Sequence, residues 1–316
     1  MSYSGSGGNI VVPTTVSNGG TTYNVTAIGK GGSSYQVFDN SSILSDSIVD
    51  LSNFTIQVKI NSYAFKDITN VSRIIFPSLG YSSMGYCFDG CGVTQVEIPA
   101  SMSWINMADF RNCTSLEEFS FITPNTQSSI TFDSGCLMGC TSLKKIVFPE
   151  GVEIWIKSQA FDGCSSLEEF NLKASLNVNH TSPNTNPLFF NDCSSLSGTF
   201  VLPKSSNVSI AGTYGLLTGT NIDGLVIGED VTLSGSNLFD YVGISEVLNL
   251  SDLEVTTTSY GLNADKVDDH LESANYIGLA KVTTINEGSV YDLLIVIPVL
   301  VVAGILIITI GIMRRF

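Results

Sequence analysis

The chain has few charged residues, and basic residues are especially scarce. Of its 316 residues only 14% are charged, with 14 Lys and Arg against 29 Asp and Glu, whereas an ordinary soluble domain carries about 25%. The net charge of −15 leaves too few cations to replace the counterions of a phosphate backbone. We therefore expect no nucleic-acid partner.

Residues that commonly carry catalysis or bind metals are also few. His180 and His270 are the only histidines, neither lies in a nucleophile motif, and no glycine-rich phosphate loop is present. Two Cys-x-x-x-Cys pairs begin at Cys87 and Cys136, but a zinc site needs four ligands and no His accompanies these pairs. No aromatic cluster marks a ligand pocket. The sequence predicts a protein that is not an enzyme and needs no cofactor.

The N-terminus lacks the features of a secretory signal. Residues 1–8 contain neither a basic region nor an apolar run. Either a signal has been removed, or the chain reaches its destination without one. Asn-x-Ser/Thr sequons, which favour exposure outside the cell, begin at Asn24, Asn40, Asn53, Asn70, Asn112, Asn179, Asn207 and Asn249.

One long uncharged run is present at the C-terminus. Residues 293–313 carry no charge, and a helix of that length, rising about 1.5 Å per residue, matches a hydrocarbon core about 30 Å thick. Asp292 precedes the run, and Arg314 and Arg315 follow it. The sequence predicts a single transmembrane α-helix that contacts membrane lipid, or a helix in the core of an assembly.

The residues that flank this run leave two topologies open. The positive-inside rule places Arg314 and Arg315 in the cytoplasm and the rest of the chain outside. Against this, a three-residue tail crosses a membrane more easily than about 290 residues, which would keep the chain inside, where free cysteines persist. We expect the outside arrangement.

An internal repeat dominates the rest of the sequence. Its template is apolar-x-x-Cys-x-Ser-Leu-x-x-apolar-x-apolar, often followed by Pro, as in residues 110–121, 137–149 and 161–172. Successive copies are 22–29 residues apart, which is the spacing of leucine-rich-type coils. The equivalent first positions are Phe38, Phe65, Phe88, Phe110, Leu137, Phe161, Phe190, Leu217 and Phe239.

Each repeat predicts a short strand that can be buried only by its neighbours. Leu143, Ile146 and Phe148 end in period-two alternation, which is typical of a strand with one buried face, and Pro149 then ends the strand. Because one repeat cannot cover its own apolar side, stacked repeats must share a core. The predicted core residues are Phe65, Phe88, Phe110, Leu116, Leu143, Phe161, Leu167, Phe190, Leu196 and Phe239.

Five of the seven cysteines recur once per repeat, at Cys91, Cys113, Cys140, Cys164 and Cys193. Free Cys packs as a small hydrophobic residue, so this recurrence favours a structural ladder of buried thiols. One or two disulfides, or a metal site, are the alternatives, although an odd number of cysteines forbids complete pairing. Residues 117–118, 144–145 and 168–169 are Glu-Glu, Lys-Lys and Glu-Glu and predict a charge ladder on the surface.

The repeat unit resembles the BspA-type, or Treponema-type, leucine-rich repeat, and residues 10–29 resemble the first coil of that family. The resemblance covers roughly residues 9–250, and it loosens after Pro203, where Thr220 and Val242 replace Cys. It implies a mainly β solenoid with a surface role in adhesion or recognition, and it implies no catalytic residue. We expect three parts: a solenoid with an N-terminal capping coil at 1–250, a cap and stalk at 251–292 with a possible short helix near Ala264, and the membrane segment at 293–316.

Two functional hypotheses remain open. In the first, a membrane-anchored solenoid on a cell or virion surface binds a host or partner macromolecule, with a protein or glycan ligand still to be identified. In the second, the chain is a structural subunit of a virion, envelope or sheath, and its C-terminal helices pack in a membrane or a shared bundle. Both hypotheses allow a homo-oligomer.

Overall fold

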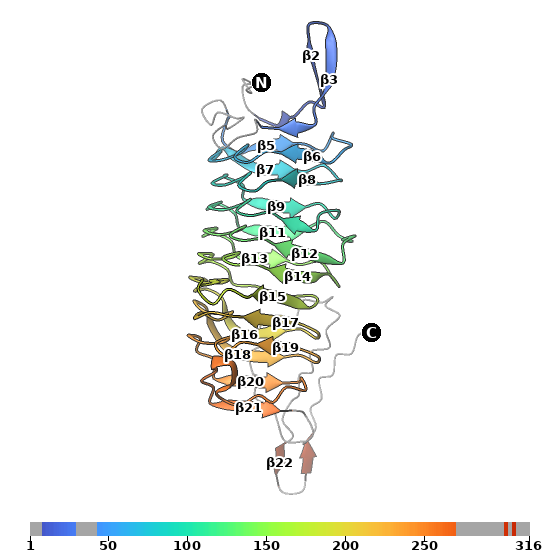
Figure 1. The fold of residues 1–316 in the computed structure, drawn as a ribbon. Helices are drawn as coiled ribbons and strands as arrows, with labels where there is room; N and C mark the ends of the chain where they lie inside the picture. The colour runs from blue at the N-terminus through green and yellow to red at the C-terminus, as the bar shows by residue number, and fades with distance from the viewer. Residues whose placement is uncertain (1–7, 30–42, 270–299, 303–304, 308–316) are drawn as a thin grey trace.

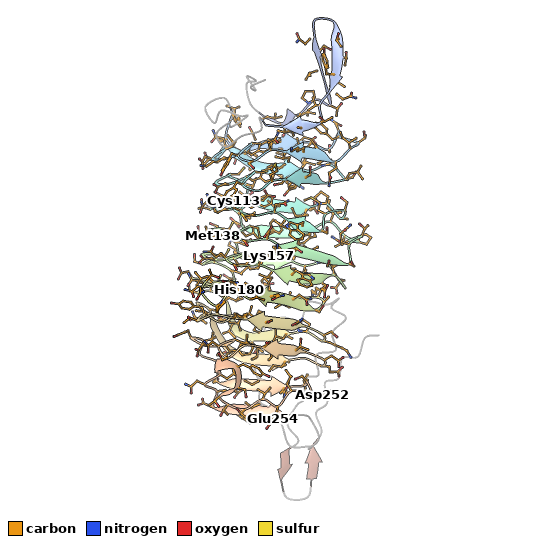
Figure 2. All side chains as sticks on the ribbon, in the orientation of Figure 1. Cys113, Met138, Lys157, His180, Asp252 and Glu254 are labelled. Atoms are coloured by element: carbon orange, nitrogen blue, oxygen red, sulfur yellow. The ribbon has the colours of Figure 1, made fainter. Side chains whose placement is uncertain are left out.

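Short strands form wherever apolar residues alternate along the repeat, and tight turns separate them. The computed structural model describes residues 8–29, 43–269, 300–302 and 305–307. Most coils contribute two short strands, and strands of successive coils pair in parallel, so that two faces lined by sheets run along the molecule (Figure 1). Side chains cover both sheets and the turns along the whole length (Figure 2). Stacking of the coils therefore builds a solenoid.

The first face of the solenoid is formed by the strands that follow the Leu of each repeat. Its six-stranded sheet contains β1 (Ile10–Val11), β5 (Ser47–Asp50), β7 (Val71–Ile75), β9 (Gln95–Ile98), β11 (Glu118–Phe121) and β13 (Lys145–Val147). A single bridge between Lys145 and Glu169 extends it. A four-stranded sheet then follows at the same position of the repeat, with β16 (Ser197–Leu202), β18 (Asn221–Ile227), β20 (Glu246–Asn249) and β21 (Lys266–Asp269).

The second face is formed by the strands that precede the aromatic turn residue. Its three-stranded sheet contains β4 (Ala27–Ile28), β6 (Val58–Ile60) and β8 (Tyr81–Ser83). Its six-stranded sheet contains β10 (Trp104–Ile105), β12 (Ser129–Phe132), β14 (Glu153–Ile156), β15 (Leu176–His180), β17 (Asn207–Ile210) and β19 (Thr232–Ser234). Parallel pairing places equivalent residues of successive coils in rows across the strands.

The core lies between the two sheets and the edge of stacked turns. Phenylalanine rings pack on one another from coil to coil, with ring centroids 4.9 Å apart for Phe88 and Phe110 and 5.2 Å apart for Phe161 and Phe190. The turns also bond to one another through the backbone, since the Phe88 N–H donates to the Asp109 carbonyl at 2.8 Å. Aromatic burial and backbone pairing therefore act between the same neighbouring coils.

The two ends of the chain add smaller elements. Near the N-terminus, β2 (Thr15–Asn18) and β3 (Thr21–Asn24) form an antiparallel hairpin that projects beyond the coils (Figure 1). Beyond residue 250 the first face continues, because the 3-10 turn η2 (Ser259–Gly261) leads into β21, which pairs with β20. The short helix expected near Ala264 is a strand instead, because the open edge of β20 supplies partners for its backbone.

The expected transmembrane helix is not supported by the described residues. Within residues 293–313, β22 (Leu300–Val302) and β23 (Ile305–Ile307) are antiparallel strands, and the other residues of this run lie outside the described parts. Val and Ile are branched at Cβ and favour strands, so a long apolar run of these residues does not by itself select a helix. Across the described ranges, no helix has both the length and the apolarity needed to span a bilayer.

Candidate recognition surface

The residues predicted for the repeat core lie between the sheets. Leu143 in the centre of the solenoid is fully buried, and Leu196 and Phe239 further along are at most 3% exposed. Phe38 lies outside the described residues. The remaining predicted core side chains are all inaccessible to solvent, namely Phe65, Phe88, Phe110, Leu116, Phe161, Leu167 and Phe190.

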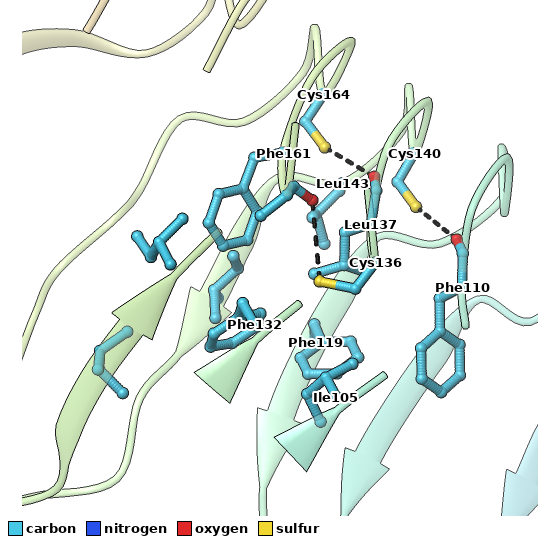
Figure 3. Close-up of a cluster of buried hydrophobic side chains, with 14 of the residues drawn as sticks. Ile105, Phe110, Phe119, Phe132, Cys136, Leu137, Cys140, Leu143, Phe161 and Cys164 are labelled. Atoms are coloured by element: carbon cyan, nitrogen blue, oxygen red, sulfur yellow. Dashed lines mark hydrogen bonds between the residues drawn. The ribbon is translucent and has the colours of Figure 1, made fainter. Parts of the chain in front are cut away.

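All seven cysteines are free and buried. Four of the five repeat cysteines donate their S–H group to a backbone carbonyl of the preceding coil. Figure 3 shows the bonds of Cys140 and Cys164. The acceptor is always the aromatic or leucine residue at the turn, as in the 3.1 Å bond from Cys140 Sγ to the Phe110 carbonyl. The other three bonds join Cys113 to Phe88, Cys164 to Leu137 and Cys193 to Phe161. Each of these carbonyls also accepts the N–H of the cysteine in its own coil, as Phe110 does from Cys113 at 3.3 Å. The thiol at this position therefore fills the core and adds a second hydrogen bond to a buried carbonyl oxygen.

The thiols are chemically unreactive in this setting. Burial raises the pKa of Cys91, Cys140 and Cys193 to about 12 and the pKa of Cys113 and Cys164 well above its ordinary value. Because only the thiolate is a nucleophile or a metal ligand, these side chains stay neutral at physiological pH. Among residues 8–29 and 43–269, no three His, Cys, Asp or Glu side chains lie together as a metal site would require.

A buried carboxylic acid interrupts a second, shorter row of cysteines. Asp109 is fully buried and takes the position directly before the turn residue, which Cys87 and Cys136 take in the neighbouring coils. Its carboxylate accepts hydrogen bonds from the Ser83 hydroxyl at 2.6 Å, the Tyr81 hydroxyl at 3.3 Å and the Cys87 N–H at 3.3 Å. Burial raises the pKa of Asp109 to about 6, although these hydrogen bonds oppose the shift.

The outer side of the first face carries paired charges. The Lys145 ammonium lies 3.0 Å from the Glu118 carboxylate, and Lys144 lies 2.8 Å from Glu117. Glu118 and Lys145 are register partners on β11 and β13. The alternation of Glu-Glu and Lys-Lys along the chain thus produces ion pairs between stacked coils, and exposed pairs of this kind contribute little stability.

The outer side of the second face carries the only two tryptophans of the chain. Trp104 on β10 and Trp155 on β14 flank Thr131 on β12 in one row across the strands. The same row continues through Asn177, Asn207 and Thr232. We call these six residues the tryptophan row. Trp104 and Trp155 are 41% and 38% exposed, which is high for a residue type that is highly buried on average.

Neighbouring polar groups fix both indole rings. The Trp104 Nε1–H donates to the Asp133 carboxylate at 3.1 Å, and the Lys157 ammonium lies 4.4 Å from the centre of the same indole. Lys157 also pairs with Asp133 at 3.4 Å; its position on the second face is labelled in Figure 2. These contacts hold an exposed ring in place without burying it.

Glu153 fixes the second indole. It accepts the Trp155 Nε1–H at 3.0 Å through one carboxylate oxygen and the Asn177 side-chain N–H at 2.6 Å through the other. Thr131 and Asn177, which flank Trp155 in the row, are only 8% and 6% exposed. The alternation of their strands points both side chains outward. They are nevertheless covered by neighbouring side chains, because the indoles lie over the sheet.

No aromatic cluster was expected from the sequence, so the exposed tryptophans of the second face were not predicted. A signal was present, because Ile154 and Ile156 alternate with Trp155 and place it on the opposite side of the strand from the core. Of the charged residues expected to flank the membrane segment, Asp292, Arg314 and Arg315 lie outside the described residues, as does His270. His180 ends β15, and its imidazole lies 3.1 Å from the Ser158 hydroxyl and from the Thr185 side chain.

Stacked coils of 22–29 residues, with a buried aromatic residue or leucine at each turn and polar outer faces, define a leucine-rich-repeat solenoid. The chain belongs to the BspA-type leucine-rich repeat family, whose repeat region it matches in six copies over residues 34–154 and 130–260. A search of curated proteins found no match.

Three solved structures are similar to this chain at low sequence identity. A leucine-rich repeat protein from Bacteroides ovatus ATCC 8483 is 19% identical, with 84% of this chain and 71% of that chain covered and a TM-score of 0.51. A leucine rich cell surface protein from Faecalibacterium prausnitzii A2-165 is 15% identical over 85% and 89% of the two chains, with a TM-score of 0.35. The pneumococcal vaccine antigen PcpA is 15% identical over 80% of each chain, with a TM-score of 0.34. The first of these likenesses supports the solenoid fold.

Proposed function

We propose that this chain is a surface-displayed recognition or adhesion protein that binds a macromolecular partner through the second face of its solenoid. In this proposal the uncharged residues 293–313 anchor it in a membrane, with the solenoid outside and Arg314 and Arg315 inside. No catalytic role is proposed, because the reactive groups among the described residues have structural partners.

The observation that carries the proposal is the placement of the two tryptophans. Trp and Tyr are enriched where proteins bind partners, because a large rigid ring gives contact area at a small entropic cost. Trp104 and Trp155 are partly exposed, lie in register and are held by Asp133, Glu153 and Lys157. Such rings need little reorganisation when a partner binds.

Binding of the full chain, reconstituted in lipid vesicles, to immobilised glycoproteins, non-glycosylated proteins and polysaccharides tests this role. We expect the double variant Trp104→Ala/Trp155→Ala to lose at least about tenfold in binding while it remains folded at the temperature of the assay, which circular dichroism checks. Val147→Ala and Tyr241→Ala are matched controls, since both remove exposed apolar side chains away from the row. Equal binding by the double variant and the wild type would overturn the proposal.

Orientation and assembly are tested on the same vesicles and on intact cells. Protease added outside should remove residues 1–290 before the membrane is opened; protection of these residues would contradict outward display. Electron microscopy of the vesicles should show separate projections. Regular lateral arrays would instead favour a structural subunit of an envelope or sheath.

A further inference from the structure

We propose that the tryptophan row binds an extended, uncharged polysaccharide chain laid across strands β10 to β19. This inference rests on the proposed recognition function and names its ligand class. The row contains Trp104, Thr131, Trp155, Asn177, Asn207 and Thr232, one residue from each of six adjacent strands. A linear ligand running perpendicular to the strands would therefore meet Trp104, Trp155, Asn207 and Thr232, whereas Thr131 and Asn177 are covered by their neighbours.

The spacing of the two indoles suits such a chain. Neighbouring strands lie about 4.8 Å apart, close to the advance of one sugar unit in an extended β-1,4-linked chain. Trp104 and Trp155 are two strands apart, so they would meet sugar units n and n+2. Alternate units of such a chain present the same ring face in the same direction. Both tryptophans would therefore stack on equivalent faces.

The chemistry of the rings favours a ligand that stacks on the indoles over one that accepts a hydrogen bond from the indole N–H groups. Both indole N–H groups already donate to carboxylates of the chain itself, Asp133 and Glu153. A ligand can therefore interact with each ring through a π face, whose negative quadrupole attracts positively polarised C–H groups. On Trp104 the Lys157 ammonium already lies over one of the two faces, which leaves the other for a sugar. A pyranose ring presents such C–H groups on its flat faces and its hydroxyls around its rim. Asn207 and Thr232, which are both exposed, can donate to and accept from those hydroxyls further along the row.

Charge selects an uncharged chain. None of the six side chains in the row is ionised, and Lys157, which lies over Trp104, is paired with Asp133. The net charge of −15 opposes the approach of a polyanion such as a sulfated glycan. A protein partner fits the row less well, because Asn and Thr continue it where the centre of a protein interface is apolar.

Calorimetric titration with cello- and chito-oligosaccharides of two to six units tests the inference on the full chain in detergent. The protein should come from a bacterial host, because Asn179 and Asn207 on this face lie in sequons. We expect affinity to rise at least about tenfold from the dimer to the tetramer of at least one series, since only a longer chain reaches both indoles. A sulfated oligosaccharide of equal length should not bind.

Substitutions should then distinguish stacking of sugar rings on the two tryptophans from nonspecific binding to the protein surface. Trp155→Ala and Trp104→Ala should each weaken tetramer binding at least about tenfold, Trp155→Tyr should restore most of it, and Val147→Ala should leave it unchanged. Failure of both series to bind, or binding that Trp155→Ala leaves unaltered, overturns the inference. If tryptophan-dependent binding is seen only with the non-glycosylated proteins of the immobilised panel, the polysaccharide inference fails while the recognition function stands.

Discussion

The central coils, from Cys87 to Cys193, and the C-terminal coils, from Gly215 to Asp269, build the same solenoid with different side chains. In the central coils, phenylalanine rings stack between coils and thiols bond to carbonyls of the preceding coil. In the C-terminal coils Leu217 takes the turn position, and Thr220 bonds within its own coil, from its hydroxyl to the Leu217 carbonyl at 2.7 Å. Both regions have a buried apolar residue at the turn. Whether a side chain then bonds to the preceding coil depends on the residue three positions later, which is Cys in the central coils and Thr220 after Leu217.

The largest expected effect is loss of a stacked ring from the central coils. Phe161 contacts the rings of Phe132, Phe170 and Phe190, so Phe161→Ala should lower the free energy of unfolding by about 3–5 kcal/mol. Leu217→Ala should cost less, because it removes fewer buried atoms and no contact between two aromatic rings. Urea denaturation followed by circular dichroism measures both. Equal shifts of the two midpoints would show that ring stacking does not distinguish the regions.

The same comparison applies within one central coil. Leu143 is fully buried, and Leu143→Ala should cost about 2–5 kcal/mol. A loss below 1 kcal/mol in the same denaturation experiment would place Leu143 outside the cooperative core.

The buried Asp109 should make the central coils sensitive to pH. Its folded-state pKa of about 6 lies above the ordinary value of 3.8, so the fold favours the neutral acid. Its stabilising contribution is complete below pH 3.8 and is lost as the pH rises through about 6, a change on the order of 3 kcal/mol. Asp109→Asn should remove this slope from the pH dependence of unfolding. Asp223→Asn, an exposed change in the C-terminal coils, should leave the slope in place.

A smaller effect is expected from the thiol ladder. Cys140→Ala removes the S–H bond to the Phe110 carbonyl, which keeps the Cys113 N–H as a donor, so the lost hydrogen bond should cost about 1 kcal/mol. Cys140→Ser keeps a donor at this position and should cost less. Thermal melts compare the two variants. In the folded protein, Cys113, Cys140 and Cys164 should resist thiol-labelling reagents until unfolding, and rapid labelling would contradict the burial of the ladder.

The smallest effect belongs to the charge pairs on the first face. Glu118→Gln breaks the 3.0 Å pair with Lys145 and should cost less than about 1 kcal/mol, because both side chains remain in contact with water. High salt should reduce the difference between the variant and the wild type further. A loss as large as that of Leu143→Ala would mean that the outer face contributes to the core stability of the central coils.

The repeat, the turn positions and the mainly β class of this protein could be predicted from its sequence alone. These follow from local rules. The positions that Phe161, Cys164 and Leu167 occupy in their repeat carry an apolar residue, Cys and Leu in every well-formed copy, and alternation assigns each strand residue to one side of the strand. The sequence could not determine which distant residues share a row, because coil lengths vary between 22 and 29 residues and only parallel pairing fixes the register. Tertiary structure therefore decided that Trp104 and Trp155 flank Thr131 and that Asp109 separates Cys87 from Cys136. It also decided that residues 266–269 add a strand to the first face, because an open sheet edge offers backbone partners that local propensity does not encode.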